Sequence, residues 1–504
     1  MTKQMRGIVR SIPIFLTALL CIIFLWWRWR VGMIRYFDAD EMAYLHWAHN
    51  VFVGRLPFVD FLSYVPPGFL YTLAPLFWLA RGTSILLAGR VFAGVVFTGI
   101  VTSTVILFWQ VRKTWVALLA GVFLAFMPIP ADKFLEIRPD SLSMLLVILG
   151  MIFHIHAFSD DKKYRSWLLS GLSYSASLLI LPKTLPQVAV ALAITAVWFF
   201  CGERRSRGRS MWYFIFGLGM PIVVFGIWIA AVARNLGQFN TVVYSLTKLP
   251  LEVNRLGEIF PIMPYQFFYP NGLLYGGDGV GSGLIANHAI WLTGLIMGSV
   301  RLVTPFLPNG KKGAWAEVLI GGSMLAYVLT FTHGYPMRNE QYLIPVSVFA
   351  AFYAADFIHV LRLRLMRTVA GSILFAVTCI TLLFVLFEVN IRVNEPKLAL
   401  TNRSDYTILH DVITAVPKDS YVFDLVGSTI YYKDPYYVSG VPFGQWIPFL
   451  SRSLPSLSKA LEVTQTHYMY EGKLGRLQGL PAADVSYITA HFHSVPVIPG
   501  MYER

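Results

Sequence analysis

The chain has 504 residues, of which 56% are hydrophobic and only 13% are charged. Together with a mean hydropathy of +0.59, this composition excludes an ordinary soluble protein and indicates a polytopic membrane protein in contact with membrane lipids. The net charge of +14 does not indicate a nucleic-acid partner, because Lys and Arg fall mainly in short loops between apolar runs.

The N-terminal residues 1–10 are basic and lead into an apolar run without a small-residue cleavage site, which predicts a retained first span rather than a signal peptide. Charge-poor runs along the chain predict about eleven transmembrane helices. These runs lie at 11–29, 84–111, 114–131, 141–159, 166–182, 184–201, 211–233, 284–307, 315–332, 341–360 and 368–389. Cys21, Cys201 and Cys379 lie in or beside such runs and indicate neither disulfides nor a metal site.

Basic loops indicate the orientation of the spans. They lie at 112–113, 162–165, 204–209, 311–312 and 362–367, and the positive-inside rule places them in the cytoplasm with the N-terminus. Segment 66–80 is short and proline-containing, so it is predicted to be a juxtamembrane or re-entrant helix rather than a full crossing. With this assignment the loops 30–83, 132–140, 234–283 and 333–340 are all exoplasmic.

The apolar runs stop at about residue 394, and residues 394–504 are long enough for a small domain. Ser404 and Asp405 can cap a helix, while 421–425 and 485–488 have the pattern of short strands. The predicted fold class is an all-α polytopic membrane domain, residues 1–393, followed by a small C-terminal α/β exoplasmic domain, residues 394–504.

An acidic cluster, Asp38, Asp40 and Glu41, opens the first exoplasmic loop. Carboxylates near hydrocarbon are costly and are kept mostly where they pair, bind an ion or move protons. Residues 42–53 can form an amphipathic helix on the membrane surface. The cluster is therefore either catalytic or an N-terminal cap of that helix.

After this cluster come Tyr44, a turn at 54–60 and a helix beginning Pro66-Pro67-Gly68. The order resembles the first exoplasmic loop of the GT-C superfamily of membrane glycosyltransferases, closest to the branch with protein O-mannosyltransferases and lipid A aminoarabinose transferases. The resemblance continues at 136–140, 181–184 and 338–345. It implies a GT-C fold and an enzyme of a bacterial inner membrane that transfers a hexosyl or pentosyl group from a polyprenyl-phosphate donor to a hydroxyl of a lipid, polysaccharide or protein.

The resemblance also implies roles for the acids. Asp40 matches the base that takes the acceptor proton, beside Glu41, and Asp140 matches the second catalytic acid. Asp38 and Glu136 are candidates for binding substrate or metal. A divalent cation, Mg²⁺ or Mn²⁺, is a candidate cofactor, because two or three carboxylates and a phosphate supply the oxygen ligands that such an ion needs.

Four cations are expected to bind the donor phosphate: Arg138, Lys183, Arg338 and Arg90. Three of them have a structural alternative. Arg138 can pair with the acids beside it, Lys183 can extend to the membrane interface, and Arg90 can pair with a loop acid. Tyr64-Val65 precede Pro66 where the lipid A branch has a lysine, so the resemblance does not fix the donor sugar.

Aromatic side chains in the outer loops could line a sugar site or form an interfacial belt; they are His333, Tyr335, Tyr265 and Tyr269. Asp278, in a glycine-rich run, is predicted to be in a turn. A transporter or flippase is the alternative function, although transporters usually have repeated halves and ionisable residues near the bilayer midplane. A glycan polymerase or ligase with a His or Arg in place of the acid is a third class.

Overall fold

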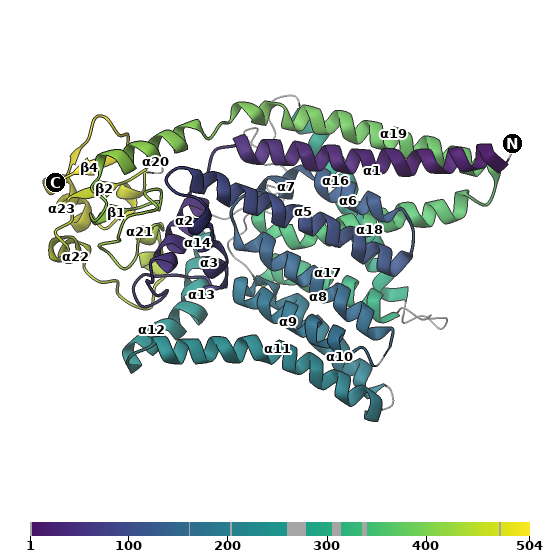
Figure 1. The fold of residues 1–504 in the computed structure, drawn as a ribbon, viewed down its shortest axis with the longest axis horizontal. Helices are drawn as coiled ribbons and strands as arrows, with labels where there is room; N and C mark the ends of the chain where they lie inside the picture. Colours follow the sequence, from purple (N-terminus) through teal and green to yellow (C-terminus); the bar gives the residue numbers. More distant parts are fainter. Residues whose placement is uncertain are drawn as a thin grey trace.

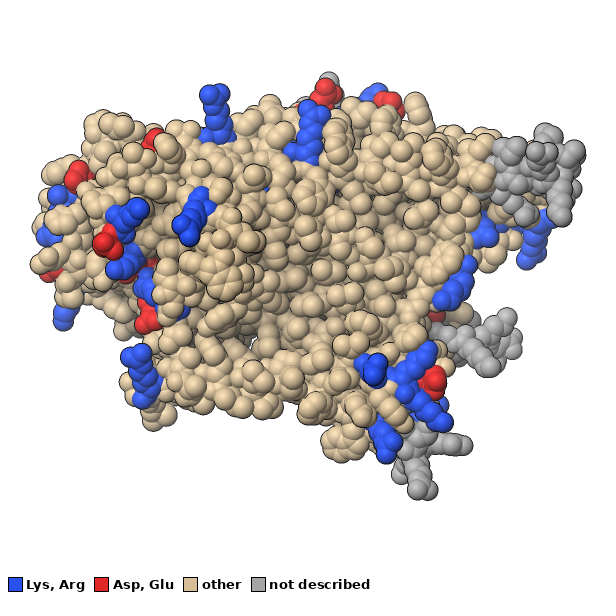
Figure 2. Space-filling model, in the orientation of Figure 1, with Lys and Arg blue, Asp and Glu red and all other residues tan. Residues whose placement is uncertain are grey.

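The computed structural model describes residues 3–160, 162–201, 204–259, 279–304, 314–334, 340–472 and 475–504. Long helices run side by side along the longest axis, with the N-terminus at one end and a small C-terminal domain at the other (Figure 1). Most of the central part of the face in Figure 2 is uncharged, and Lys and Arg gather toward the ends. This distribution is the one expected for a membrane-embedded bundle.

The bundle contains the helices that the apolar runs predict. They are α1 (Lys3–Ile34), α5 (Ser84–Arg112), α6 (Ala117–Phe126), α8 (Pro139–Phe158), α9 (Tyr164–Ile180), α10 (Leu185–Phe200), α11 (Arg204–Val232), α16 (Gly279–Val303), α17 (Ala314–Gly334), α18 (Ile344–Leu365) and α19 (Val369–Asn394). Within the described residues, eight segments are long and apolar enough to cross a membrane. The other three predicted spans correspond to α6, α9 and α16.

Shorter helices connect the bundle at both ends. They are α12 (Leu236–Thr247), α13 (Leu249–Asn254), α14 (Leu256–Ile259), and the 3₁₀ turns η1 (Pro182–Thr184), η4 (Glu340–Leu343) and η5 (Pro396–Ala399). The predicted outer loop 234–283 is thus helical over α12 to α14, and its residues 260–278, with Tyr265, Tyr269 and Asp278, lie outside the described residues.

The predicted span 114–131 is interrupted. Helix α6 ends at Phe126, and α7 (Pro128–Phe134) follows after Met127, whose φ of −42° and ψ of 109° are not helical. Pro128 explains the break, because a proline disfavours the helical conformation of the residue before it. The prediction of one continuous helix here is therefore wrong, and α7 forms a separate turn that carries Asp132 and Lys133.

Segment 66–80 forms two short helices, α3 (Gly68–Leu73) and α4 (Leu76–Leu79), separated at Pro75. Even as one continuous helix, the segment Gly68–Leu79 would extend only about 18 Å, less than the roughly 30 Å hydrocarbon core. A Cβ on Gly68 would lie 2.5 Å from the carbonyl oxygen of Leu179, so α3 packs directly on the end of α9. The geometry agrees with the predicted juxtamembrane segment.

Helix α2 (Ala39–Phe52) begins three residues before its predicted start. It was expected to lie on the membrane surface, but its residues from Glu41 to Ala48 are buried by protein. The C-terminal domain covers it: Gly427 has φ +87°, and a Cβ there would lie 2.7 Å from the Cα of Ala43. The amphipathic pattern therefore reflects burial between two parts of the protein rather than contact with lipid.

The C-terminal domain is α/β, as predicted. Its elements are α20 (Arg403–Ala415), β1 (Val422–Asp424), α21 (Phe443–Trp446), η6 (Ile447–Phe449), α22 (Leu457–Val463), β2 (Tyr468–Tyr470), η7 (Arg476–Gly479), α23 (Ala482–His491), β3 (His493–Ser494) and β4 (Met501–Glu503). The sheet order is β1-β2-β4-β3, with β1 parallel to β2 and β4 antiparallel to both its neighbours.

The predicted strand at 485–488 is wrong, because these residues lie within α23. Val485 and Ile488 are three residues apart, a spacing that places both on one face of a helix. Ile488 is buried against the domain core. That same core also contains Leu45 of α2 and Phe69 of α3, so the C-terminal domain and the juxtamembrane helices are packed as one unit.

Candidate active site

The first acidic cluster forms the N-terminus of α2 as a capping box. The Asp38 side chain accepts a hydrogen bond from the backbone N–H of Asp40 at 3.0 Å, and Glu41 Oε2 accepts one from the backbone N–H of Asp38 at 2.9 Å. This pair satisfies backbone donors that a helix start leaves unpaired. The Asp40 carboxylate takes no part in the box.

Glu41 is completely buried and connects three segments. Its Oε1 accepts from the backbone N–H of Ile137 at 2.8 Å, and its Oε2 accepts from Arg90 Nη2 at 2.6 Å. Burial raises the pKa of Glu41 to about 7, and the nearby Arg90 acts in the opposite direction. Arg90 is also buried and donates to the carbonyls of Gly32 and Tyr36. Both side chains therefore fix α2 against α5 and the second acidic loop.

The second acidic loop joins α7 to α8. Glu136 is buried and contacts Lys133 Nζ at 2.9 Å, Arg138 Nε at 2.5 Å and Arg35 Nη2 at 3.1 Å. Burial opposes its ionisation, but the three cations together hold the pKa of Glu136 well below its usual range. Glu136 is thus a fully paired carboxylate that orders the cations around it.

Arg138 brings the two acidic loops together. It is the N-cap residue of α8, and its Nη2 lies 3.2 Å from Asp38 Oδ1 and 2.8 Å from Asp40 Oδ2. The side chains of Asp38 and Asp40 are 30% and 38% exposed, while that of Arg138 is only 5% exposed. The sequence-based hypothesis that the two acidic clusters lie on one side of the bundle agrees with these contacts.

A second ion pair lies at the same end of the bundle. Lys183, in η1, is 3.2 Å from Asp140 Oδ1, and its Nζ lies 3.6 Å from the centre of the Tyr342 ring. Tyr44 is buried and Tyr64 is partly buried, and burial raises the pKa of both. Asp40 and Asp140 both act electrostatically on Tyr44, so both acids lie near this aromatic group.

Three cations near the acids were not predicted: Arg35, Lys133 and Arg476. Lys133 lies three residues before Glu136, a spacing that would have indicated the pair. Arg476 comes from the C-terminal domain and has no sequence signal. Its Nη1 donates to the carbonyls of Leu425, at 2.5 Å, and Gly440, at 3.3 Å.

Arg476 lies near the first acidic cluster. A Cβ on Gly440 would lie 3.7 Å from that of Ala43, three residues after Asp40. Burial lowers the pKa of Arg476, and Asp40 is the strongest influence in the opposite direction. Within the described residues, Arg35, Lys133, Arg138 and Lys183 all contact a carboxylate, whereas the hydrogen bonds of Arg476 go to carbonyls.

Of the remaining predicted residues, Arg338 and Tyr335 lie outside the described residues. His333 is exposed at the end of α17, where its Nδ1 contacts Thr332 Oγ1 at 2.8 Å and the carbonyl of Leu329 at 3.2 Å. Its predicted role in substrate binding stays a prediction.

The described acids do not form a ready site for a divalent cation. No group of three or more His, Cys, Asp or Glu residues that could hold a metal is found in the described part of the chain. Asp38 and Asp40 face the same guanidinium, and Asp140 faces an ammonium group. These carboxylates, paired with cations, do not fit a Mg²⁺ or Mn²⁺ ion held by the protein alone.

Comparison with known proteins identifies the architecture. No family model and no curated protein sequence matches the chain. Among solved structures, ArnT from Cupriavidus metallidurans bound to undecaprenyl phosphate is similar with a TM-score of 0.56 and 10% identity, covering 97% of each chain. The chain has the GT-C fold.

Two structures of the Archaeoglobus fulgidus oligosaccharyltransferase share the GT-C fold with this chain. One, tethered to an acceptor peptide, has a TM-score of 0.54 and 9% identity over 96% of this chain and 74% of the other. The other, in complex with Zn and sulfate, has a TM-score of 0.50 and 11% identity over 98% and 73%. The GT-C architecture predicted by resemblance is therefore confirmed at the level of the fold.

Proposed function

We propose that this GT-C protein is a glycosyltransferase that moves a sugar from a polyprenyl-phosphate donor to an acceptor hydroxyl on the exoplasmic face. The observation that carries the proposal is the joining of two acidic loops through Arg138, with Asp38 and Asp40 partly exposed. Two of the similar structures support it, since one holds undecaprenyl phosphate and another holds an acceptor peptide.

Asp40 is the proposed base. Three acids contact Arg138, and the carboxylate of Asp40 is the most exposed of them. It is not used in the helix cap. In one displacement, the acceptor oxygen bonds to the anomeric carbon while the bond from that carbon to the phosphate oxygen breaks. The acceptor proton passes to Asp40, and the electron pair leaves with the polyprenyl phosphate.

The proposed phosphate site consists of Arg138, Lys183 and Arg476, with Lys133 behind them. Cationic donors stabilise the charge that grows on the leaving phosphate. The phosphate competes with Asp38 and Asp40 for Arg138, because one guanidinium nitrogen now serves both carboxylates. Donor binding thereby frees Asp40 to accept the proton from the acceptor.

Glu41 and Arg90 have a positioning role in this scheme. Both were predicted to act directly, Glu41 in catalysis and Arg90 on the donor phosphate. Because each is buried and bonded to the other, we assign them to holding the loop that carries Arg138. Asp140 orients Lys183 and lies within reach of the same aromatic group.

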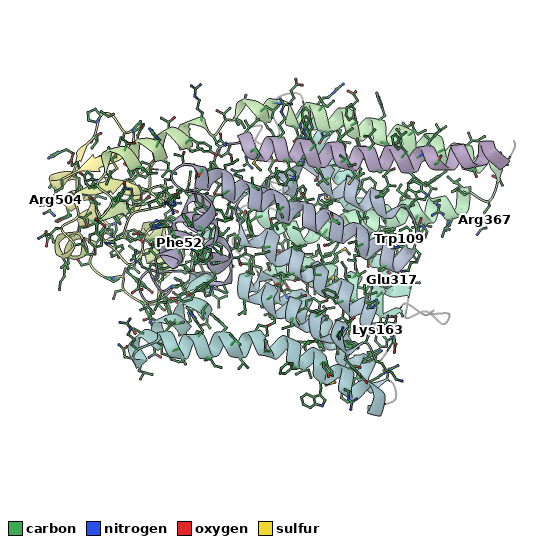
Figure 3. All side chains as sticks on the ribbon, viewed as in Figure 1. Phe52, Trp109, Lys163, Glu317, Arg367 and Arg504 are labelled. Atoms are coloured by element: carbon green, nitrogen blue, oxygen red, sulfur yellow. The ribbon has the colours of Figure 1, made fainter. Side chains whose placement is uncertain are left out.

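The proposed orientation places the basic loops and the N-terminus in the cytoplasm and the C-terminal domain outside, in a bacterial inner membrane. Figure 3 shows Lys163 and Arg367 at one end of the bundle, and Phe52 of α2 and Arg504 at the other. The positive-inside rule makes the first end cytoplasmic. The donor and acceptor classes named above, a hexosyl or pentosyl group and a lipid, polysaccharide or protein, belong to the same proposal.

The test combines a cell-level and a purified assay. Mass spectrometry of surface glycans and lipids from cells with and without the chain would identify the sugar that is lost. Transfer by the purified full chain in liposomes is then measured with Asp40→Asn and with Asp419→Asn, an exposed control acid of the C-terminal domain. We expect Asp40→Asn to lower transfer about 10²- to 10⁴-fold and Asp419→Asn to leave it unchanged.

Full transfer by Asp40→Asn would remove the base assignment. Uptake of a solute into vesicles without any transfer would refute the glycosyltransferase and favour a transporter.

A further inference from the structure

A cavity lies at the end of the bundle opposite the acidic loops. It has a volume of about 390 Å³ and lies where α1, α18 and α19 meet the link between α5 and α6. Pro13, Trp115 and Phe375 are among its apolar lining residues. A volume of this size is within the range of small-molecule sites in proteins.

The polar side of the cavity is positively charged. Arg362, in the last turn of α18, and Arg367, in the link to α19, both line it, together with Ser372 in the first turn of α19. No carboxylate is among the described residues that line it. The nearest acid along α18, Asp356, is already bonded to Arg112 and Arg301. The described lining of the cavity is therefore positively charged.

Arg362 is held in place by the protein. Its Nη1 donates to Thr114 Oγ1, in the link between α5 and α6. Trp115, the next residue, packs edge-on against Phe375 of α19, with 6.4 Å between the ring centres. An ordered guanidinium beside an aromatic wall suits a ligand that has both an anionic and an apolar part.

Two of the helices that line the cavity carry exposed apolar side chains. On α1, Phe15 and Ile22 are exposed, and on α19, Leu374 and Val377 are exposed. Figure 3 labels Arg367 at the end of the bundle where α19 begins. The charged part of a ligand here would lie at the depth of lipid headgroups, and its apolar part would extend along these faces.

We propose that this cavity binds an anionic phospholipid of the leaflet on the side of the basic loops. Arg362 and Arg367 contact the phosphate, and the acyl chains lie along α1 and α19. The charge of the rim selects an anionic over a zwitterionic lipid, and the apolar lining selects a lipid over a free phosphate ion. The site is independent of the proposed transfer reaction, which takes place at the other end of the bundle.

The test uses the purified full chain and native mass spectrometry, with phosphatidylglycerol as the anionic probe and phosphatidylcholine as the neutral one. Arg367→Gln removes an exposed guanidinium of the rim. Arg364→Gln is the matched control, because Arg364 is exposed in the last turn of α18, three residues before Arg367, but does not line the cavity. We expect Arg367→Gln to weaken phosphatidylglycerol binding about fivefold and Arg364→Gln to leave it unchanged.

Arg362→Gln is expected to have at least as large an effect. Within the described part of the chain Arg367 makes no bond like that of Arg362 to Thr114, so the test does not depend on the folding of the Arg362 variant. Equal retention of phosphatidylglycerol by the Arg367 and Arg364 variants would overturn the proposal. So would equal binding of phosphatidylcholine, or displacement of the lipid by millimolar inorganic phosphate, which would make a free anion the ligand.

Discussion

The substitution Glu41→Gln tests whether Glu41 holds other groups in position or takes part in the reaction. The substitution keeps the size of the side chain but leaves one oxygen where the carboxylate has two. That carboxylate accepts from Arg90 Nη2, from the N–H of Asp38 and from the N–H of Ile137. In either amide orientation, the new NH₂ group faces a buried donor.

The cost follows from these contacts. A buried donor without an acceptor costs about 1 to 3 kcal/mol, and a buried cation that loses its partner costs roughly 3 to 5 kcal/mol. Because Arg90 and Glu41 are both almost fully buried, we expect Glu41→Gln to destabilise the protein by about 3 to 5 kcal/mol. By contrast, Asp40→Asn changes a partly exposed pair, and such pairs contribute about 0 to 1 kcal/mol.

The assay is thermal unfolding of the purified chain in detergent, compared at one scan rate, alongside sugar transfer. Glu41→Gln should lower both the apparent Tm and transfer, whereas Asp40→Asn should lower transfer alone. An unchanged Tm for Glu41→Gln would refute the assignment of Glu41 as a positioning residue. A large loss of Tm in Asp40→Asn would show that Asp40 is structural instead.

Two further predictions concern the C-terminal domain. His46 of α2 lies between two acceptors, the carbonyl of Ile430 at 3.0 Å and Asp434 Oδ1 at 2.8 Å. Burial lowers the pKa of His46, but the effect of Asp434 is larger, so the pKa is raised above the usual 6.5. The stabilisation by protonated His46 is therefore complete below pH 6.5 and is lost as the pH rises through the raised pKa. Between pH 6.5 and 9 the apparent Tm of the unmodified protein should fall more than that of the His46→Gln variant. Parallel curves of Tm against pH for the two proteins would contradict this. Arg476→Ala should raise the KM for the lipid-phosphate donor about tenfold, the value of one charged hydrogen bond, with partial rescue by Arg476→Lys. An unchanged donor KM in initial-rate measurements would exclude Arg476 from the phosphate site.

The sequence predicts the bundle well because membrane insertion depends on local composition. Hydropathy and basic loops locate the helices, and the exception at Met127 has a local cause in Pro128. The strand expected at 485–488 failed for a different reason. A run of four residues fits the period of a strand as well as that of a helix, and packing against the domain core favours the helix.

The pairing of the site depends on contacts that local patterns do not reveal. Glu41 and Arg90 are 49 residues apart in the chain, and Arg138 and Asp38 are 100 apart. His46 and Asp434 are separated by 388 residues. Sequence analysis identified most of these charged residues as important, but whether each one acts on substrate or on another side chain depends on which partner the fold supplies.

The distribution of partners in turn distinguishes the acids from one another. Glu41 and Glu136 are buried and each contacts several donors, so protonating either would leave buried cations without a counter-charge. Asp38 is committed to the helix cap, and Asp140, only 6% exposed, faces Lys183. Asp40 has the more exposed carboxylate and contacts a guanidinium that an incoming phosphate can take over. Asp40 can therefore exchange its partner for substrate at lower structural cost than the other acids of the two loops.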